Sequence, residues 1–316
     1  MKTIWGFGTA TIDIRIKTAD YGEGYKDKLL SQEMSICGGG ATANFLSQIA
    51  RLGGNAGYIG KTGTDPFGEF ALRSLSEEKI NISAVIRDTE QISPFNLAVY
   101  AGDLKRRVGG YLLPNALTNI TCKDISHFTS FMKSDDWLLI EVGEIPLTAC
   151  LDLARKAKCK GVKIAIDVDL DPIKQCREKK EDIQELFNCC DILLPNKSSL
   201  KSLYPEYEIH EMLQALYDMY HVVVIITDGG NGSNVIEISG KILHFPCVKT
   251  LVVDTVGAGV AFHGGVIWAM AEGLSIRKAV ELGTICGSHN CMTFGARGGM
   301  ISSKELNQYK FEIEEL

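Results

Sequence analysis

The chain has 316 residues, 45% of them hydrophobic and 23% charged, so it can bury a large core and does not have the composition of a disordered protein. Its net charge of −6, with lysine and arginine scattered along the chain, argues against an extended nucleic-acid-binding surface. Ten cysteines without a CxxC pair and six histidines without ligand spacing indicate reduced thiols and no tightly held transition metal.

The N-terminal segment predicts two strands of different character. Residues 4–10 are apolar and end in small residues, as in a short buried strand, whereas apolar and polar residues alternate from Ile12 to Ile16, as in a half-exposed strand. Asp13 interrupts the segment before a signal-like apolar run is complete, and no 18-residue apolar segment follows elsewhere. We therefore expect a cytoplasmic protein that is neither secreted nor membrane-spanning.

Strands and helices then alternate along most of the chain. Residues 42–52 have helical spacing that ends at a Gly-Gly pair, and further helices are predicted at 67–78, 147–158, 180–188 and 212–220. Continuous apolar strands separate these helices, among them the segments WLLIEV, KIAIDVDL, DILLPN and VVVIIT. This order predicts an α/β fold with a doubly wound, mostly parallel sheet flanked by helices on both faces.

Two excursions from this alternation predict a second, smaller sheet. Residues 94–113 read as two strands around a turn, and they could pair with the strand near Asp13. After residue 227 the chain becomes hairpin-rich, and two helices, the last at 276–293, close it. We expect one discontinuous domain, 1–316, with a β-sheet lid formed by about residues 11–37 and 92–115.

The segment VVDTVGAGVAFHGG, residues 252–265, is the first that points to chemistry. Its Gly257, Ala258 and Gly259 lie between a strand and an apolar helix, so the first backbone N–H groups of the helix would point toward an anion. A tight turn chosen only for packing would have the same glycines.

The chain also resembles the ribokinase (PfkB) family of carbohydrate kinases over essentially its whole length. The N-terminal signature of the family is a GG turn with an Asn, then ARLG and GxxGxDxxG; this sequence has Gly39, Gly40, Asn44, residues 50–53, Gly60, Gly63, Asp65 and Gly68. Further along, DILLPNKSSL resembles the family's NxxE strand end, TDGGNG its nucleotide turn, and DTVGAGV its C-terminal signature DTxGAGD. The motifs follow in the family's order.

The resemblance implies a sugar kinase that uses ATP and Mg²⁺, and in some members K⁺. It implies that the acceptor sugar is bound by Asp13, Gly39, Gly40, Asn44 and, from the lid, Arg107. It implies that the nucleotide is bound by Asn196, Thr227, Gly229, Gly232, Gly257, Gly259 and Asn290. The GAG turn would form the anion hole, Asp254 would belong to a loop near a monovalent cation, and two subunits could pair through the lids.

The sequence departs from the family at two positions on the reaction path. Val260 stands where the family has the aspartate that takes the proton from the acceptor hydroxyl, and Ser199 stands where it has the glutamate of NxxE. Losing a positioned base typically costs about 10² to 10⁴ in rate. Asp254 and His263 are the nearest replacement bases, and we rank both below a simple loss of activity. One nucleotide change converts Asp to Val, so the sequence leaves open whether Val260 is natural.

Three readings of function follow. The first is an ATP-dependent kinase of a sugar or related polyol, impaired at Val260, with a nucleoside kinase as a variant of it. The second is an inactive sugar- or nucleotide-binding protein that acts through regulation. The third, an NAD-dependent oxidoreductase suggested by the GFGTAT segment, fails because the third glycine and the following acidic residue are absent. The substrate stays open; a phosphosugar could meet basic residues at Arg15, Lys17, Arg106 and Arg107.

Overall fold

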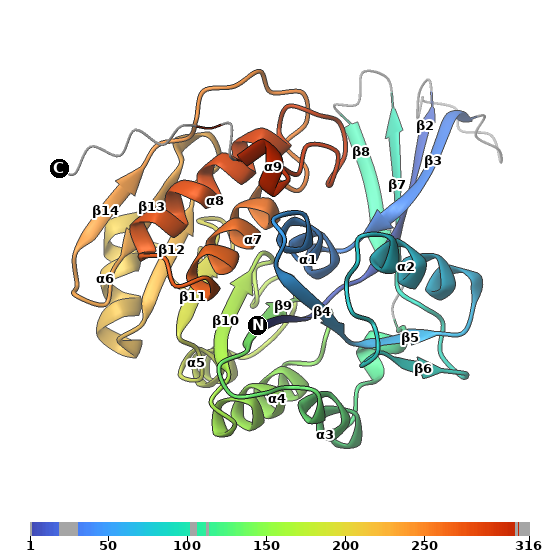
Figure 1. Cartoon of the computed structure of the whole chain (residues 1–316), viewed down its shortest axis with the longest axis horizontal. Helices are drawn as coiled ribbons and strands as arrows, with labels where there is room; N and C mark the ends of the chain where they lie inside the picture. The colour runs from blue at the N-terminus through green and yellow to red at the C-terminus, as the bar shows by residue number, and fades with distance from the viewer. Residues whose placement is uncertain (1, 19–30, 102–105, 112–113, 307–308, 310–316) are drawn as a thin grey trace.

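The computed structural model describes residues 2–18, 31–101, 106–111, 114–306 and 309, and an eight-stranded sheet runs through these residues (Figure 1). In spatial order its strands are β14 (Ile242–Phe245), β13 (Ser233–Ile236), β12 (Val223–Thr227), β11 (Ile192–Pro195), β10 (Lys163–Val168), β9 (Trp137–Val142), β1 (Thr3–Phe7) and β4 (Asn55–Ile59). Six of these strands pair in parallel, and β13 and β14 form an antiparallel hairpin at one edge.

Helices cover both faces of this sheet, which explains its continuous apolar strands. One core forms beneath α3 (Cys122–Ser130), α4 (Leu147–Cys159), α5 (Lys180–Phe187) and α6 (Ile209–Tyr220). The other forms beneath α1 (Ala41–Arg51), α2 (Pro66–Glu77), α7 (Ala258–Ala271) and α8 (Ile276–Asn290). Within β9, Leu138 and Ile140 enter the first core and Leu139 the second, as strand alternation requires.

A four-stranded sheet stands at the side of the large one, to the upper right in Figure 1. Its order is β3 (Ser31–Gly39), β2 (Thr11–Thr18), β7 (Phe95–Ala101) and β8 (Arg106–Tyr111). Asp13 pairs with Cys37 on one side and Asn96 on the other. Strands β5 (Lys61–Gly63) and β6 (Ile86–Asp88) form a further short pair, and η1 (Ala116–Asn119), η2 (Gly229–Asn231) and α9 (Ser303–Leu306) complete the elements. The expected fold class is confirmed.

The structure differs from the expected elements in three places. Strand β1 ends at Phe7 rather than at residue 10, because the backbone N–H of Thr9 donates to the Glu141 carboxylate instead of extending the sheet. Helix α3 was not predicted; only a narrow apolar face is buried, and a capping box between Thr121 and Asp124 starts it. Helix α8 ends at Asn290, and the short α9 follows it, so two helices do not close the chain.

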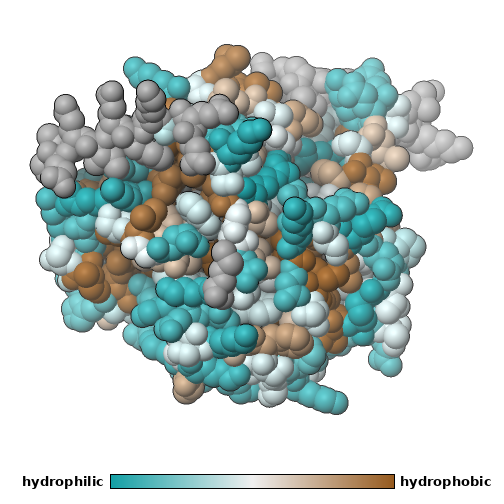
Figure 2. All heavy atoms as spheres, in the orientation of Figure 1, coloured by the Kyte–Doolittle hydropathy of each residue, from teal (hydrophilic) through white to brown (hydrophobic). Residues whose placement is uncertain are grey.

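The surface shows no broad apolar face in the view of Figure 2, where brown areas are separated by teal and white ones. Within the described ranges, none of the helices has the length and apolar character needed to cross a bilayer.

Candidate active site

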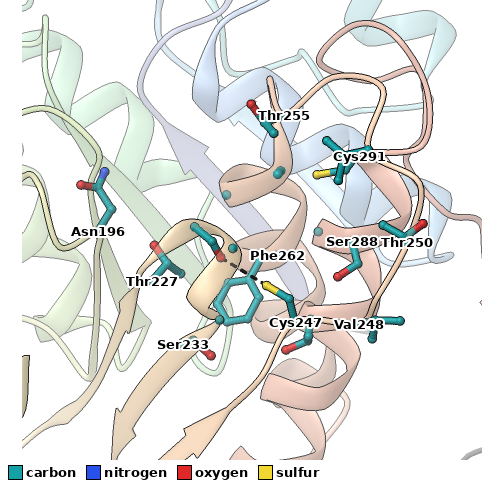
Figure 3. Close-up of a pocket in the computed structure, with 18 residues that line it drawn as sticks. Asn196, Thr227, Ser233, Cys247, Val248, Thr250, Thr255, Phe262, Ser288 and Cys291 are labelled. Carbon is teal, nitrogen blue, oxygen red and sulfur yellow. Dashed lines mark hydrogen bonds between the residues drawn. The ribbon is translucent and has the colours of Figure 1, made fainter.

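A cavity of about 360 Å³ opens beside the start of α7, at the end of the large sheet where β11 and β12 terminate. Six of the residues that the sequence singled out line it: Asn196, Thr227, Gly229, Gly232, Ala258 and Gly259. In Figure 3 Asn196 and Thr227 lie on one side, Val248, Thr250 and Ser288 on the other, and the Phe262 ring between them. The fold therefore brings four distant segments around one cavity.

The walls of this cavity are mostly apolar or small. Val248 and Val252 come from the segment that precedes α7, and Gly287 and Cys291 come from α8 and its end. The Cys247 thiol donates to the Gly229 carbonyl oxygen over 3.2 Å and joins this segment to the turn after β12 (Figure 3). An apolar slot of this size suits a flat heterocycle better than a freely hydrated polyol.

The start of α7 supplies the polar end of the cavity. Gly257 is the N-cap, with a φ of +82°, and a Cβ built on it would lie 2.2 Å from the carbonyl oxygen of Ala296, so only glycine fits without displacing that backbone. No side chain caps the helix, and a Cβ at Gly259 would meet nothing within 4 Å. The Ala258 N–H donates to the Thr255 carbonyl oxygen, and within the described residues the N–H groups of Gly259 and Val260 are left to receive an anion.

Val260 follows directly and lies half-buried against the apolar core beneath α7. Its side chain has no atom that can accept a proton, whatever its orientation. His263, one turn further, is buried, and its Nδ1 lies 3.4 Å from Asp167 Oδ2. His263 does not line the cavity, so the structure gives it no direct access there.

Asp254 holds together the two loops that flank α7. One carboxylate oxygen accepts from the backbone N–H of Val256 at 3.0 Å and the other from that of Gly295 at 2.9 Å. The side chain is thus committed to two backbone amides and has a structural role in this loop.

The polar side chains of the NxxE-like turn form hydrogen bonds with each other and with the neighbouring Asp169. The Asn196 side chain donates to the carbonyl oxygen and to Oδ1 of Asp169, at 2.9 and 3.1 Å, and its own oxygen accepts from the Ser199 backbone N–H. Ser199 is buried, and its hydroxyl donates to the Asn196 carbonyl oxygen over 2.8 Å. Ser199 therefore completes the turn and offers nothing to the cavity.

A second group of predicted residues meets where β2 and β3 join the start of α1. A Cβ on Gly39 would lie 2.4 Å from the Asp13 carboxylate, so that carboxylate lies directly against the glycine backbone. Gly40 is the N-cap of α1, with a φ of +92°. Asn44, in the first turn of α1, is buried and accepts from Arg297 Nε over 2.6 Å. The fold brings together Asp13, Gly39, Gly40 and Asn44 as expected.

Sequence reasoning missed a buried carboxylate that supports this group. Glu141, in β9, accepts from the backbone N–H groups of Thr9 and Thr42 at 2.8 and 3.1 Å and from both hydroxyls. Burial raises the pKa of Glu141, and these donors oppose the rise. An acidic residue inside the apolar strand WLLIEV was the available signal.

Two residues that the sequence assigned to the ligands, Asn290 and Arg107, are not placed at the site by the described part of the structure. Asn290 is fully buried, donates to the carbonyl oxygens of Val256 and Ala296, and does not line the cavity. Arg107 lies in β8 opposite Tyr100, and its side chain is outside the described parts of the structure. Asp65 of the N-terminal signature caps α2 and accepts from the backbone of Ser93. It is a structural residue.

The two groups are neighbours through one loop. Ala296 packs against Gly257 at the start of α7, and Arg297, the next residue, bonds to Asn44. Arg51 of α1 fixes the same loop by donating to the Arg297 and Met300 carbonyl oxygens. The loop at residues 296–300 therefore contacts both the start of α7 at the cavity and the Asn44 side of the Asp13 group.

Comparisons with known proteins identify the family of the chain. The chain matches the family described as pfkB family carbohydrate kinase over residues 1–303. It is 26% identical over 292 residues to a ribokinase from Lactococcus lactis, covering 92% of this chain and 90% of that protein.

Solved structures share the fold along nearly the whole chain. The ribokinase of Arabidopsis thaliana complexed with ribose and ATP is 20% identical, with a TM-score of 0.82 and 97% of each chain covered. A double mutant of Vibrio cholerae fructokinase, with fructose, ADP and potassium ion bound, is 22% identical, with a TM-score of 0.77 and 98% of each chain covered.

Proposed function

This chain belongs to the pfkB family of carbohydrate kinases, and from that premise we propose that it binds ATP in the cavity beside α7 and a sugar or related polyol beside Asp13 and Asn44. The observation that carries the proposal is the start of α7, which no side chain caps and which lies against the same loop that bonds to Asn44. The relatives named ribokinase and fructokinase support an acceptor of this class.

In the proposed reaction an acceptor hydroxyl attacks the γ-phosphorus of ATP. The bond between that phosphorus and the β–γ bridging oxygen breaks, and ADP leaves. Asp13 and Asn44 orient the acceptor, which contributes through positioning. The N–H groups at Gly259 and Val260 stabilise negative charge on the transferred group. Because Val260 takes no proton, the hydroxyl proton passes to solvent.

We infer that this reaction is slow. A positioned general base typically contributes about 10² to 10⁴ in rate, and the side chain at position 260 supplies none. Positioning and the anion site remain, so turnover is reduced and not abolished.

Mg²⁺ would be held at the carboxylate of Asp169, next to Asn196 at the cavity wall. Burial and the charge of Asp167 raise the pKa of the Asp169 carboxyl, and a bound cation would favour its ionised form. Bound there, the ion would neutralise charge on the phosphates. Among the described residues no group of three or more His, Cys, Asp or Glu side chains is arranged as a metal site, which fits Mg²⁺ because it usually binds through one or two carboxylates and substrate phosphates. We assign K⁺, if used, to the loop that Asp254 organises.

A second candidate function is a regulatory binding protein without turnover. The loss of side-chain chemistry at Val260 and the self-contained turn at Ser199 favour it. It shares the binding sites of the first candidate and differs only in catalysis.

We also propose that two copies pair through the small sheet. Met34 and Ile36 in β3 are 64% and 47% exposed and lie on the same face of the sheet. Apolar residues on an exposed sheet benefit from a covering partner.

The experiment compares ADP release by the native chain, Val260→Asp and Val260→Asn, with ATP, Mg²⁺, K⁺ and a panel of sugars and nucleosides. Asparagine matches aspartate in size and accepts no proton, so it controls for polarity. We expect Val260→Asp alone to raise turnover, with all three proteins stabilised against heat by the same ligands. Turnover by the native chain at an ordinary kinase rate, roughly 1–100 s⁻¹, would contradict a lost base. Absence of stabilisation by ATP would contradict the binding proposal.

A further inference from the structure

The acceptor side of the site contains an arginine whose hydrogen-bonding capacity is unused. Arg15 lies two residues beyond Asp13 on the same face of β2, and only 10% of its side chain is exposed. Its nearest carboxylate oxygen, Asp13 Oδ2, is 3.6 Å from Nη2, too far for a hydrogen bond. Its guanidinium lies 5.7 Å from the centre of the Phe294 ring. Among the described residues the Arg15 guanidinium therefore makes an ion pair without a hydrogen bond.

Arg297 brings a second guanidinium to the same place. Its Nε donates to Asn44 and its Nη1 donates to Ser74 Oγ over 3.0 Å, so both acceptors are neutral. Within the described ranges no carboxylate oxygen lies within 4.0 Å of it. Burial lowers the pKa of Arg297, yet a guanidinium stays protonated in proteins. A partly buried cation without a matching anion is costly unless a ligand supplies the anion.

Both arginines lie near the end of β3. Charges on Arg15, Asp13 and Arg297 all act on the Cys37 thiol, which lies in β3 opposite Asp13. A Cβ on Gly38 would lie 3.3 Å from Arg297 Nη1, and one on Gly295 would lie 3.8 Å from Arg15 Nη1. Glu78 is the carboxylate whose charge acts most strongly on Arg297, but it is already paired with Arg51 at 2.6 Å. Together with Arg15 and Asp13, the described side chains around Arg297 therefore hold three positive charges and two negative charges.

We propose that the acceptor carries an anionic group, a phosphate monoester or a carboxylate, which Arg15 and Arg297 bind together. This proposal rests on the proposed function and specifies its substrate class. Asp13 then binds the hydroxyls, and the two guanidinium groups bind the anion, whose oxygens match their forked donors. A neutral sugar would leave one positive charge uncompensated in a partly buried site.

A purely structural role makes a different prediction. If Arg297 only ties its loop to Asn44 and Ser74, and Arg15 only stacks on Phe294, their removal lowers stability equally with and without an anion. If the two arginines bind an anion, their removal lowers stability more in the presence of the anion than in its absence.

The first test uses inorganic phosphate as the probe and keeps the nucleotide site saturated with ADP. Melting temperature is followed against phosphate concentration for the native chain, Arg15→Gln, Arg297→Gln and the control Arg277→Gln. Arg277 lies on α8, and its side chain pairs with Glu237. We expect phosphate to stabilise the native chain and the control, with the apparent affinity at least tenfold weaker in Arg15→Gln. Equal phosphate stabilisation of all four proteins, or none in the native chain, would overturn the proposal.

Arg15→Gln keeps the test valid if Arg297→Gln fails to fold, because Arg15 makes no hydrogen bond that holds a loop. ADP affinity is measured for each variant by calorimetry. Normal ADP affinity with no phosphate effect in the native chain rejects the anionic acceptor alone. Absent ADP binding in the native chain rejects the proposed function itself.

The second test identifies the source of the anion. Binding of matched pairs is measured by calorimetry: ribose with ribose 5-phosphate, fructose with fructose 6-phosphate, and glucose with gluconate. We expect one charged class to bind at least tenfold more tightly than its neutral partner, with the preference reduced in Arg15→Gln. Tighter binding of the neutral member in every pair would contradict the proposal.

Discussion

The two halves of the candidate site differ in whether backbone or side-chain groups form them. The nucleotide side is formed mainly by backbone. Gly257 sets the turn, and Ala258 and Gly259 at the start of α7 line the cavity. The acceptor side is formed mainly by side chains. Asp13 accepts a hydrogen bond from Asn96, Asn44 accepts one from Arg297, and Glu141 accepts one from the backbone N–H of Thr9. A site made of backbone persists when nearby side chains change, whereas a site made of side chains loses its chemistry with one substitution.

Val260 lies in the first turn of α7. Under the proposed function the valine leaves the backbone amides in place and removes proton transfer, so we expect binding and turnover to be separable in this chain. The following variants test this separation, from the largest expected effect to the smallest.

Gly257→Ala tests the backbone half. A left-handed backbone costs a non-glycine residue about 1–2 kcal/mol, and the new Cβ would also meet the Ala296 carbonyl oxygen. We expect the free energy of unfolding to fall by about 3 kcal/mol and the ADP affinity to fall at least tenfold. Chemical denaturation and calorimetry measure the two quantities. Gly259→Ala is the control for stability, because its Cβ meets nothing; equal destabilisation by both would contradict this reading.

Glu144, two residues after β9, is a partly buried carboxyl near Glu141, and Glu144→Gln tests its titration. Burial, and then the charge of Glu141, raises the pKa of Glu144 from 4.5 to about 7. The folded state therefore holds a proton that the unfolded state has released, so the free energy of unfolding falls as pH rises from about 4.5 through 7.

Over this pH range we expect the free energy of unfolding of the native chain to fall by about 2 kcal/mol. In Glu144→Gln this fall should be absent. Denaturation at a series of pH values measures the difference. Parallel pH profiles for the two proteins would show that Glu144 is not the titrating group.

Ser199→Ala tests whether the serine has taken over a metal-binding role. The hydroxyl donates only to the Asn196 carbonyl oxygen, so we expect a loss of about 1 kcal/mol in stability and an unaltered Mg²⁺ concentration dependence of ATP binding. A shift in that Mg²⁺ dependence would instead assign Ser199 to the metal site.

The sequence predicted the parts of the molecule that have local patterns. Apolar strands, helix spacing and glycine-rich turns located the two sheets and the start of α7, because burial and backbone conformation leave a periodic or compositional trace. Helix α3 was missed because its apolar face is narrow and its start depends on the capping box at Thr121.

The missed site residues depend on tertiary contacts. Arg297 lies in a glycine-rich loop without periodicity and reaches Asn44, 253 positions earlier in the chain. Arg15 was named from the sequence as a possible contact of a phosphosugar, but its burial could not be predicted, because alternation gives the face of a strand and not what covers that face. Asn290 was expected at the nucleotide and is instead used to hold two loops together.

The most direct test of the account is single-turnover phosphoryl transfer by the native chain and by Val260→Asp, with protein in excess over radiolabelled ATP and a saturating acceptor. The account predicts similar ATP affinities and rate constants for transfer that differ by about 10² to 10⁴. Equal transfer rate constants would show that the residue at position 260 does not limit chemistry and that another group accepts the proton.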